Sequence, residues 1–290
     1  MISIIITAYK EASTIGKAIG AILQNKLQDY EILILSPDDE TLNAAKKYAE
    51  KFKQIRLIKD KGKGKPAALN LAFEKAKGDI LVLTDGDVYV DRNALPPLIE
   101  KFKQGIGAVT GRPIPVNDRK KMLGYWGHLL FYVAHKRREK ALQIKKRIFC
   151  SGYLYAFRKG IFGKIPEETL SEDGYISHLI YEEGCKIDYS PESTVYVKYP
   201  LTFKDWVIQK KRSVGGYNQI MIWIGKEIRS FKKESLGIFD VLRYPQNIRE
   251  FFYTLALLFA RLYLWLLIFI DINIKKKELK KIWLRVDSTK

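Results

Sequence analysis

Residues 78–87 have the sequence G-D-I-L-V-L-T-D-G-D. Ile80–Thr84 form a largely apolar run with the length of one strand, which is typical of a strand buried on both faces of a parallel sheet. Two carboxylates, Asp85 and Asp87, follow the run at once. Because ligands of open α/β sheets bind at the carboxyl ends of the strands, this stretch predicts a sheet and one part of a binding site.

Strands and helices alternate along the chain on both sides of this stretch. Apolar runs predict strands at 3–7, 31–35, 55–58 and 108–111. Helical spacing of apolar residues predicts helices at 13–23, 39–52, 65–77 and 93–102. This alternation predicts an α/β fold with a mixed, mainly parallel sheet and helices on both faces. The strand-end segments 7–11, 36–39 and 85–87 should therefore meet at one rim.

The pattern changes after residue 118. Residues 122–133 are rich in aromatic and apolar side chains, a strand is predicted at 149–157, and a helix near 170–184. Ser171 can cap that helix, and the acids Glu172 and Asp173 favour its positive N-terminal end. A further long helix is predicted over 205–228, interrupted at Gly215-Gly216.

These changes divide the chain into three predicted parts. Residues 1–204 form the α/β domain, 205–247 form amphipathic interface helices, and 248–290 form an apolar helix with a basic tail. Residues 251–270 are F-F-Y-T-L-A-L-L-F-A-R-L-Y-L-W-L-L-I-F-I. As a helix, such a segment spans about 30 Å, the thickness of a hydrocarbon core.

The apolar segment allows several arrangements. A buried core helix is one, but Tyr and Trp within the segment and basic residues around it favour a membrane element. Arg261 lies mid-segment, where a charge is costly in lipid, and a single span would place the basic tail outside. The segment could be re-entrant, lie in the interface plane, or pack against copies of itself as a homo-oligomer with Arg261 inward.

The charge predicts an anionic partner. The chain has 51 Lys and Arg against 32 Asp and Glu, a formal charge of +19. Residues 119–147 hold ten basic residues and one acid, and 275–290 hold seven and two. No recognisable nucleic-acid-binding motif accompanies them, and both patches adjoin apolar aromatic segments, so an anionic membrane is favoured over nucleic acid. A basic nucleic-acid-binding protein is the alternative.

Composition excludes several other classes. Hydrophobic residues make up 47% of the chain, which excludes disorder as its main state. Two cysteines, Cys150 and Cys185, cannot form a disulfide scaffold or a zinc site. The N-terminal residues lack the features of a signal peptide, so we expect the cytoplasmic face of the membrane. The abundance of Lys, Ile, Tyr and Glu suggests a thermophile.

Two short segments predict phosphate chemistry. Asp85 and Asp87 can hold a hard cation whose other ligands are diphosphate oxygens. Residues 61–66, K-G-K-G-K-P, place Lys65, other cations and backbone N–H groups where a phosphate would bind. The P-loop pattern is absent, which argues against a P-loop ATPase. Each segment alone could also be an ordinary turn.

Taken in order along the chain, these and other segments resemble a family 2 glycosyltransferase with the GT-A fold. The matching segments cover about residues 1–216 and are I-I-I-T-A-Y-K-E at 4–11, G-K-P-A-A-L-N at 64–70, G-D-I-L-V-L-T-D-G-D at 78–87, F-C-S-G-Y-L-Y-A-F-R at 149–158, S-E-D at 171–173 and Q-K-K-R at 209–212. The cellulose, hyaluronan and chitin-oligosaccharide synthase branch looks closest. The resemblance implies transfer of a sugar with inversion from a nucleotide-diphospho-sugar, with UDP as the expected nucleotide.

The resemblance also implies roles for the catalytic residues. Asp87 would bind Mg²⁺ or Mn²⁺, and Asp85 would contact the nucleotide-sugar or the metal. Asp173 would be the general base, and Glu172 beside it would raise its pKa, which suits a base. Capping of a helix is the alternative role for this pair.

Other residues would bind substrate. Thr7, Tyr9 and Glu11 would border the base and ribose, with Asp38 or Asp39 nearby. Gln209 and Arg212 would lie near the diphosphate and acceptor. These assignments, like those above, follow from the resemblance.

Two departures from the family pattern bear on function. Ser36-Pro37 occupy the places of two acids, so either Asp38 or Asp39 could contact the nucleotide. Ser213 stands where the family has tryptophan after Arg212. This difference and the small number of apolar segments favour an enzyme that adds one sugar to its acceptor. The acceptor would be lipid-linked, a glycan or another membrane-associated molecule. A processive polysaccharide synthase subunit is the alternative.

Two further classes fit less well. A sugar-phosphate nucleotidyltransferase would need a glycine-rich, arginine-bearing loop after the first strand, where residues 7–11 are T-A-Y-K-E. A scaffold with a decayed site would not need Asp85, Asp87 and Asp173.

Overall fold

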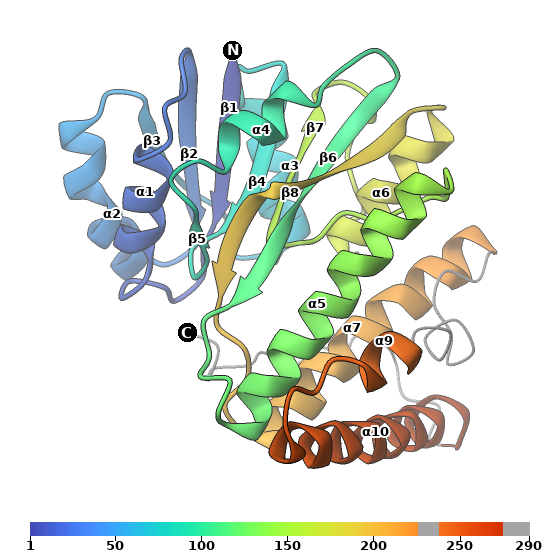
Figure 1. Cartoon of the computed structure of the whole chain (residues 1–290). Helices are drawn as coiled ribbons and strands as arrows, with labels where there is room; N and C mark the ends of the chain where they lie inside the picture. The colour runs from blue at the N-terminus through green and yellow to red at the C-terminus, as the bar shows by residue number, and fades with distance from the viewer. Residues whose placement is uncertain (226–237, 275–290) are drawn as a thin grey trace. The chain divides into compact units, whose positions relative to one another are not determined.

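The computed structural model describes residues 1–225 and 238–274 (Figure 1). The predicted helix end at 226–228 and the basic tail at 275–290 lie outside the described residues. The described chain forms two compact units. The first unit contains residues 1–114 and 138–197, and the second contains residues 115–137, 198–225 and 238–274. The functional boundaries at 204 and 247 remain predictions.

The first unit is built on one eight-stranded sheet with the order β3-β2-β1-β4-β7-β6-β8-β5 (Figure 1). The strands are β1 (Ile2–Thr7), β2 (Tyr30–Ser36), β3 (Ile55–Lys59), β4 (Ile80–Asp85), β5 (Tyr89–Val90), β6 (Ile106–Pro115), β7 (Leu154–Arg158) and β8 (Lys186–Val197). Strand β1 pairs in parallel with β2 and β4, and β2 pairs in parallel with β3. Strand β7 is antiparallel to β4 and β6, and β5 is antiparallel to β8. The predicted mixed α/β fold is confirmed.

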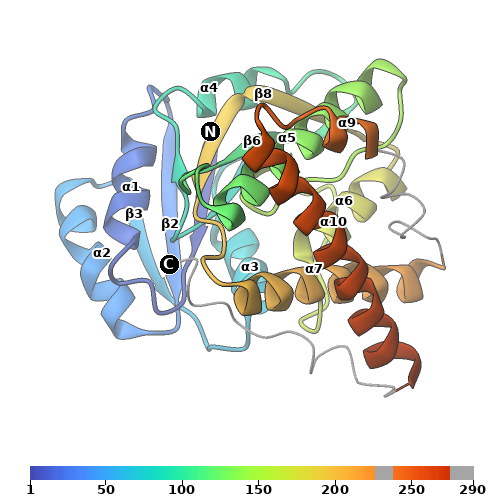
Figure 2. The ribbon, with the colours of Figure 1, turned by 60° about the horizontal axis from the view of Figure 1, so that its bottom comes forward.

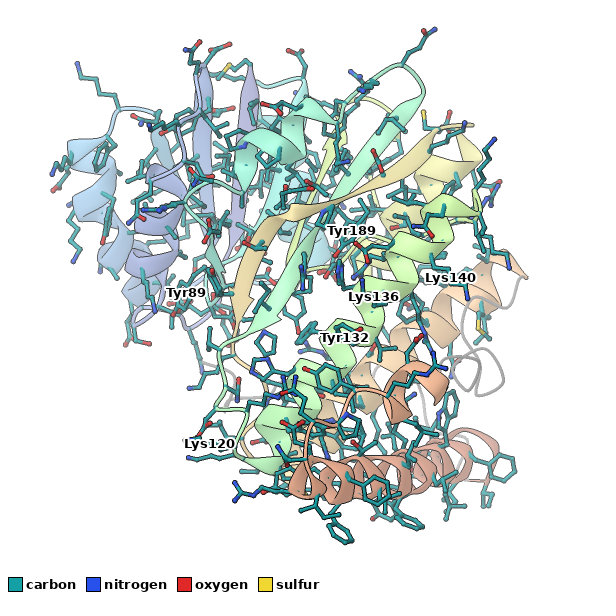
Figure 3. All side chains as sticks on the ribbon, viewed as in Figure 1. Tyr89, Lys120, Tyr132, Lys136, Lys140 and Tyr189 are labelled. Carbon is teal, nitrogen blue, oxygen red and sulfur yellow. The ribbon has the colours of Figure 1, made fainter. Side chains whose placement is uncertain are left out.

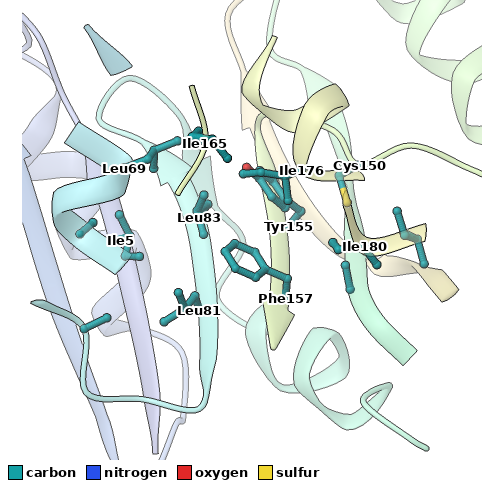
Figure 4. Close-up of a cluster of buried hydrophobic side chains, with 14 of the residues drawn as sticks. Ile5, Leu69, Leu81, Leu83, Cys150, Tyr155, Phe157, Ile165, Ile176 and Ile180 are labelled. Carbon is teal, nitrogen blue, oxygen red and sulfur yellow. The ribbon is translucent and has the colours of Figure 1, made fainter. Parts of the chain in front are cut away.

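Two layers of helices cover this sheet. The helices of the first unit are α1 (Ile15–Leu23), α2 (Asp39–Lys51), α3 (Lys65–Lys75), α4 (Leu95–Glu100) and α6 (Glu172–Glu182). Helices α3 and α6 pack on one face, where Leu69 and Ile176 join Ile5, Leu83 and Phe157 in a buried cluster (Figure 4). Alternate residues of the strands point to the opposite face, where α1 and α4 lie (Figure 1).

Two expectations about secondary structure need correction, and one strand was not expected. The strand expected from 149 begins at Leu154, because the residues before it turn toward α6. The 12-residue strand β8 was not expected, because its sequence K-I-D-Y-S-P-E-S-T-V-Y-V mixes polar residues and a proline with apolar ones. The expected break at Gly215-Gly216 is also wrong: α7 runs through both glycines, which are buried.

The second unit is helical. It contains most of α5 (Met122–Gln143), α7 (Phe203–Ile224), α9 (Ile238–Leu242), α10 (Ile248–Phe269) and the π-helical turn η1 (Ile270–Ile274). Its core joins Trp126 of α5, Trp206 of α7 and Leu257 of α10. Thr202 accepts the backbone N–H of Asp205 at the start of α7, and Gly225 ends that helix at φ +65°. Helices α7 and α10 contact each other (Figure 2).

Candidate active site

The first part of the site lies where β1 and β4 end. The parallel register places Thr7 opposite Asp85. Thr7 donates its hydroxyl to Asp85 Oδ1 at 3.0 Å, and the backbone N–H of Gly86 donates to the carbonyl oxygen of Thr7 at 3.1 Å. The turn Asp85-Gly86-Asp87 is therefore fixed to the end of β1, at the rim that the strand-end rule predicts.

Glu11 lies against the same turn. A Cβ atom on Gly86 would lie 2.5 Å from Glu11 Oε2 and 2.9 Å from the Cβ of Ala8, so only glycine fits at this position. Asp87 and Glu11 also both act on Tyr89, whose pKa is raised by burial first and then by these two carboxylates. Thr7, Glu11, Asp85 and Asp87 are thus brought together.

Lys65 joins this rim to α6. It is the first residue of α3 and follows Gly64, which has φ +100°. Its Nζ atom lies 2.7 Å from Asp85 Oδ1 and 2.7 Å from Glu172 Oε1. Burial opposes the charge, but these two carboxylates raise the pKa of Lys65 above its ordinary value. Lys65 is therefore a cation held between the end of β4 and the start of α6.

Asp173 lies in the first turn of α6 and is held by three hydrogen bonds. Its Oδ1 accepts from the Ser171 hydroxyl at 2.7 Å and from the Gly174 N–H at 2.8 Å, and its Oδ2 accepts from the Gly152 N–H at 3.0 Å. Burial raises the pKa of Asp173 most and the charge of Glu172 raises it further, although the hydrogen bonds from Ser171 and Gly174 act in the opposite direction. Ser171 occupies the N-cap position but makes no side-chain cap, which corrects the expectation that it caps α6.

The structure distinguishes the two acids after β2. Asp38 caps α2 and accepts from the N–H of Thr41 at 2.9 Å, from the N–H of Lys10 at 2.7 Å and from the Ser36 hydroxyl at 2.9 Å. Burial opposes ionisation, but these bonds lower the pKa of Asp38 to about 2. Asp39 instead forms an exposed ion pair of 2.7 Å with Lys59. Asp38 is the acid that contacts the loop after β1.

Asp60 is a candidate that was not expected from the sequence. It follows β3 directly, and its Oδ1 accepts the N–H of Gly62 at 2.7 Å. Burial raises the pKa of Asp60, and the charge of Asp38 acts in the same direction, so these two acids are neighbours. The strand-end rule that singled out Asp38 would have found Asp60 if applied to the third strand.

Tyr155 is a second candidate without a sequence signal. It lies on β7 beside Ile176 of α6 (Figure 4), and 1% of its surface is exposed. Its hydroxyl has no hydrogen-bond partner within the described part of the chain. Burial raises the pKa of Tyr155 most, and the charges of Glu172 and Asp173 raise it further. A buried hydroxyl of this kind carries a desolvation cost that is not offset.

Gln209 and Arg212 belong to the second unit. They are three residues apart on α7 and therefore share one face of that helix. Tyr9, in the loop after β1, is exposed. The roles that the resemblance implies for these three residues remain predictions.

The residues at the end of β4 fit a divalent cation that is shared with a phosphate ligand. No group of three or more His, Cys, Asp or Glu side chains that could hold a metal ion occurs within residues 1–225 and 238–274. Asp85 and Asp87 supply two carboxylates, and the Asp85 side chain contacts Thr7 and Lys65 through Oδ1, so Oδ2 could bind a cation without breaking these contacts. Mg²⁺ is commonly bound in this way, by one or two carboxylates together with phosphate oxygens.

Comparisons with known proteins agree with this geometry. The family model described as glycosyl transferase family 2 matches residues 3–165. A probable glycosyltransferase of Bacillus subtilis, YdaM, is 25% identical over 275 residues, which is 89% of this chain. The match covers 63% of that relative, so this chain spans less than two thirds of its length.

Solved structures share the fold. The mannosyltransferase PcManGT from Pyrobaculum calidifontis, in complex with GDP-Man and Mn²⁺, aligns with a TM-score of 0.59 and 20% identity, over 97% of this chain and 82% of that one. S. aureus TarS 1–349 in complex with UDP-GlcNAc aligns with a TM-score of 0.53 and 13% identity, over 84% of this chain and 73% of that one.

Proposed function

The chain belongs to glycosyl transferase family 2, and we propose that it is an inverting glycosyltransferase of the membrane surface. It would transfer a sugar from a nucleotide-diphospho-sugar, a UDP-sugar in the first place, to an acceptor hydroxyl or phosphate. The observation that carries the proposal is the placement of Lys65, which joins Asp85 at the end of β4 to Glu172 at the start of α6. Metal-assisted transfer from a diphosphate uses carboxylates to hold the metal ion and cations to stabilise the charge of the leaving group.

The donor diphosphate would lie at the end of β4. Asp85 and Asp87 would hold Mg²⁺ or Mn²⁺, which would neutralise charge on the diphosphate as it leaves. Lys65 would add a second positive charge, because its two carboxylate neighbours keep it protonated. The complexes of PcManGT with GDP-Man and Mn²⁺ and of TarS with UDP-GlcNAc support this donor class.

Asp173 is the proposed general base. Its raised pKa strengthens its affinity for a proton, and its three hydrogen bonds fix its orientation. The carboxylate would take the proton of the acceptor hydroxyl as that oxygen attacks the anomeric carbon. The new carbon–oxygen bond forms as the bond to the diphosphate breaks, and the diphosphate leaves with the electron pair. Attack from the face opposite the leaving group inverts the anomeric centre.

The remaining candidates would bind substrate. Thr7 and Glu11 support the proposal through their contacts with the Asp85-Gly86-Asp87 turn. Tyr9 would border the base and ribose, and Asp38 would act by ordering the loop that carries Tyr9. Asp39 would contribute less, because it already pairs with Lys59.

The acceptor would be presented at the cytoplasmic face of a membrane, as a lipid-linked saccharide, a polyprenyl phosphate or a glycolipid. Helix α10 supports this location, since it is long and apolar enough to cross a membrane by length and composition. Gln209 and Arg212 on α7 would contact the diphosphate or the acceptor.

The first test is binding of the free nucleotides and their sugars. Thermal shift with UDP, GDP, UDP-sugars and GDP-mannose, each with and without Mn²⁺, should show the largest rise in Tm for a uridine ligand with metal. A larger rise for the guanine series would replace UDP by GDP and leave the transferase proposal intact. No shift with any nucleotide would contradict the transferase proposal.

The second test is transfer itself. The full chain is incubated with the donor that binds and with a lipid-linked acceptor, and the product is analysed by mass spectrometry. Addition of one sugar is expected. A ladder of many sugars would favour the alternative of a processive synthase subunit. Activity retained by both Asp87→Ala and Asp173→Asn would contradict the residue assignments.

A further inference from the structure

Helix α10 has two different faces. Residues Glu250, Thr254, Leu257, Ala260, Leu264 and Ile268 are buried. Large apolar side chains of the same helix are exposed, including Phe252 at 60%, Phe259 at 70% and Leu266 at 55%. Because successive residues of a helix turn by about 100°, these two sets lie on opposite sides of α10. One side is packed, and the other is an apolar surface, which we call the outer face of α10.

The packed side is fastened to the second unit by polar contacts near both ends. Arg119 makes two hydrogen bonds to the carboxylate of Glu250, at 2.8 Å and 3.0 Å, in the first turn of α10. Thr254 shares a hydrogen bond of 2.7 Å with the hydroxyl of Tyr125. At the other end, Lys211 of α7 pairs with Asp271, just after α10. The helix is thus tied to parts of α5 and α7 in its own unit.

These neighbours are unsuited to a bilayer interior. If α10 crossed the membrane, the segments packed along it would have to enter the hydrocarbon core as well. Helix α7 carries Lys210, Lys211 and Arg212 in its middle, and charges at that depth are costly. Arg261 lies on the packed side of α10 too, since it follows Leu257 by four residues and precedes Leu264 by three.

We propose that α10 lies in the plane of an anionic membrane surface, with its outer face inserted at the boundary of headgroups and acyl chains. This inference rests on the membrane association in the proposed function and specifies how the helix is placed. A helix with one strongly apolar exposed side and cationic surroundings is typical of such interfacial segments.

Charge indicates which partner covers the outer face. The described residues of the second unit carry 13 Lys and Arg against 5 Asp and Glu, whereas those of the first unit carry 27 against 23. Two copies meeting through such a basic unit would repel each other, whereas an anionic leaflet attracts it. The surface therefore favours anionic lipid over a second copy of the chain.

Basic residues lie in and beside α10. Lys120, which precedes α5 (Figure 3), accepts a hydrogen bond through its carbonyl oxygen from the hydroxyl of Tyr253 on α10. Lys204 adjoins Phe203, whose ring stacks with that of Tyr263 on α10 at 6.3 Å. Arg249 lies exposed in the first turn of α10. Each of these cations can stay at the level of the headgroups while the aromatic rings enter the lipid.

Co-flotation of the full chain with vesicles tests whether anionic lipid covers the outer face. Vesicles of phosphatidylcholine with phosphatidylglycerol should bind the chain, and phosphatidylcholine vesicles should bind it less. Phe252→Gln combined with Phe259→Gln keeps the charge and should weaken binding at least about tenfold. Ile144→Gln is the matched control, because Ile144 is 52% exposed but lies outside α10, and it should bind as the unaltered chain does.

Spin labels measure the orientation of the helix. Cysteines replace Phe252, Phe259 and Leu266 one at a time in a Cys185→Ser background, where the remaining Cys150 is buried. These three positions lie on the outer face and are spaced seven residues apart, or about 10 Å along a helix. An in-plane helix gives equal depths for all three labels on vesicles. A spanning helix places the label at 259 about 10 Å deeper than the other two, which would overturn the inference.

The outcomes separate this inference from the proposed function. If the chain fails to bind vesicles and light scattering shows a dimer that Phe259→Gln dissociates, the outer face is a self-association surface and the inference is wrong. Nucleotide binding in the thermal-shift assay does not depend on lipid and decides the transferase proposal by itself.

Discussion

Lys65 and Glu172, the first residues of α3 and α6, form an ion pair of 2.7 Å. A carboxylate at the N-terminus of a helix interacts favourably with the helix dipole, but a lysine there does not. The position of Lys65 therefore does not stabilise α3 and is explained better by its contacts with Glu172 and Asp85. We interpret this lysine as part of the donor site.

Replacing Lys65 with Met should lower the transfer rate by about 100-fold, the usual effect of removing one group that stabilises developing charge. Lys65→Arg, which keeps the charge, should retain more activity than Lys65→Met. Steady-state kinetics with varied donor checks both variants. A loss confined to the thermal stability of Lys65→Met, with unchanged kcat, would mean that the ion pair is only structural.

The parts of the fold that the sequence predicted share a local signal. Strands β1, β2 and β4 are apolar runs, and the order of strands and helices was enough to place the residues at their ends, among them Thr7, Asp38 and Asp85, at one rim. The family follows from the same short segments. Assignment to the cellulose, hyaluronan and chitin-oligosaccharide branch remains a prediction.

The features that escaped the sequence depend on contacts between distant residues. The bond between Gly152 and Asp173 joins the loop before β7 to the first turn of α6, and the bridge through Lys65 joins three segments. Packing also overrides local preference, since α7 continues through its two buried glycines. The sidedness of α10 was hidden because both of its faces contain apolar residues, and only burial distinguishes them.

Gly152 offers a test of how Asp173 is positioned. A Cβ atom on Gly152 would lie 3.2 Å from Asp173 Oδ2, closer than ordinary contact, so Gly152→Ala should displace the carboxylate by a few tenths of an ångström. We expect transfer to fall by about tenfold to 100-fold, because catalysis is sensitive to small misplacements of the base. The control is Gly163→Ala, since within the described residues no heavy atom apart from its chain neighbours lies within 4 Å of the added Cβ there. Equal activities of the two variants would contradict the assigned base.

The pH dependence of transfer follows from the raised pKa of Asp173. A general base must be deprotonated, so the rate should fall as the pH drops through a pKa that lies above the ordinary aspartate value of 3.8. Glu172→Gln removes the neighbouring negative charge that contributes to this rise and should move the acid limb to lower pH. The measurement is kcat/KM against pH for both proteins. A shift toward higher pH in Glu172→Gln would be inconsistent with this electrostatic account.

Asp38 should contribute to stability in a defined pH range. Asp38→Ala removes the cap of α2 and should cost about 1 kcal/mol of unfolding free energy near neutral pH. The pKa of Asp38 is lowered to about 2 in the folded chain, so its stabilisation is present above about pH 4 and is lost as the pH falls toward 2. Urea unfolding at about pH 7 and about pH 3 measures this change. The matched control Asp39→Ala, which loses one exposed ion pair, should cost much less at either pH.

Tyr155→Phe should stabilise the free protein. Its buried hydroxyl has no hydrogen-bond partner within the described residues, and removing such a group should recover about 1 kcal/mol of desolvation free energy. Tyr181→Phe is the opposite control, because the Tyr181 hydroxyl donates to the carbonyl oxygen of Ile148 and accepts its N–H, and its loss should lower Tm. If the Tyr155 hydroxyl gains a hydrogen-bond partner when substrates bind, Tyr155→Phe should lose its higher Tm once nucleotide and metal are present. The kcat of this variant should then also fall. A lower Tm for Tyr155→Phe in the free protein would show that the hydroxyl is already satisfied there.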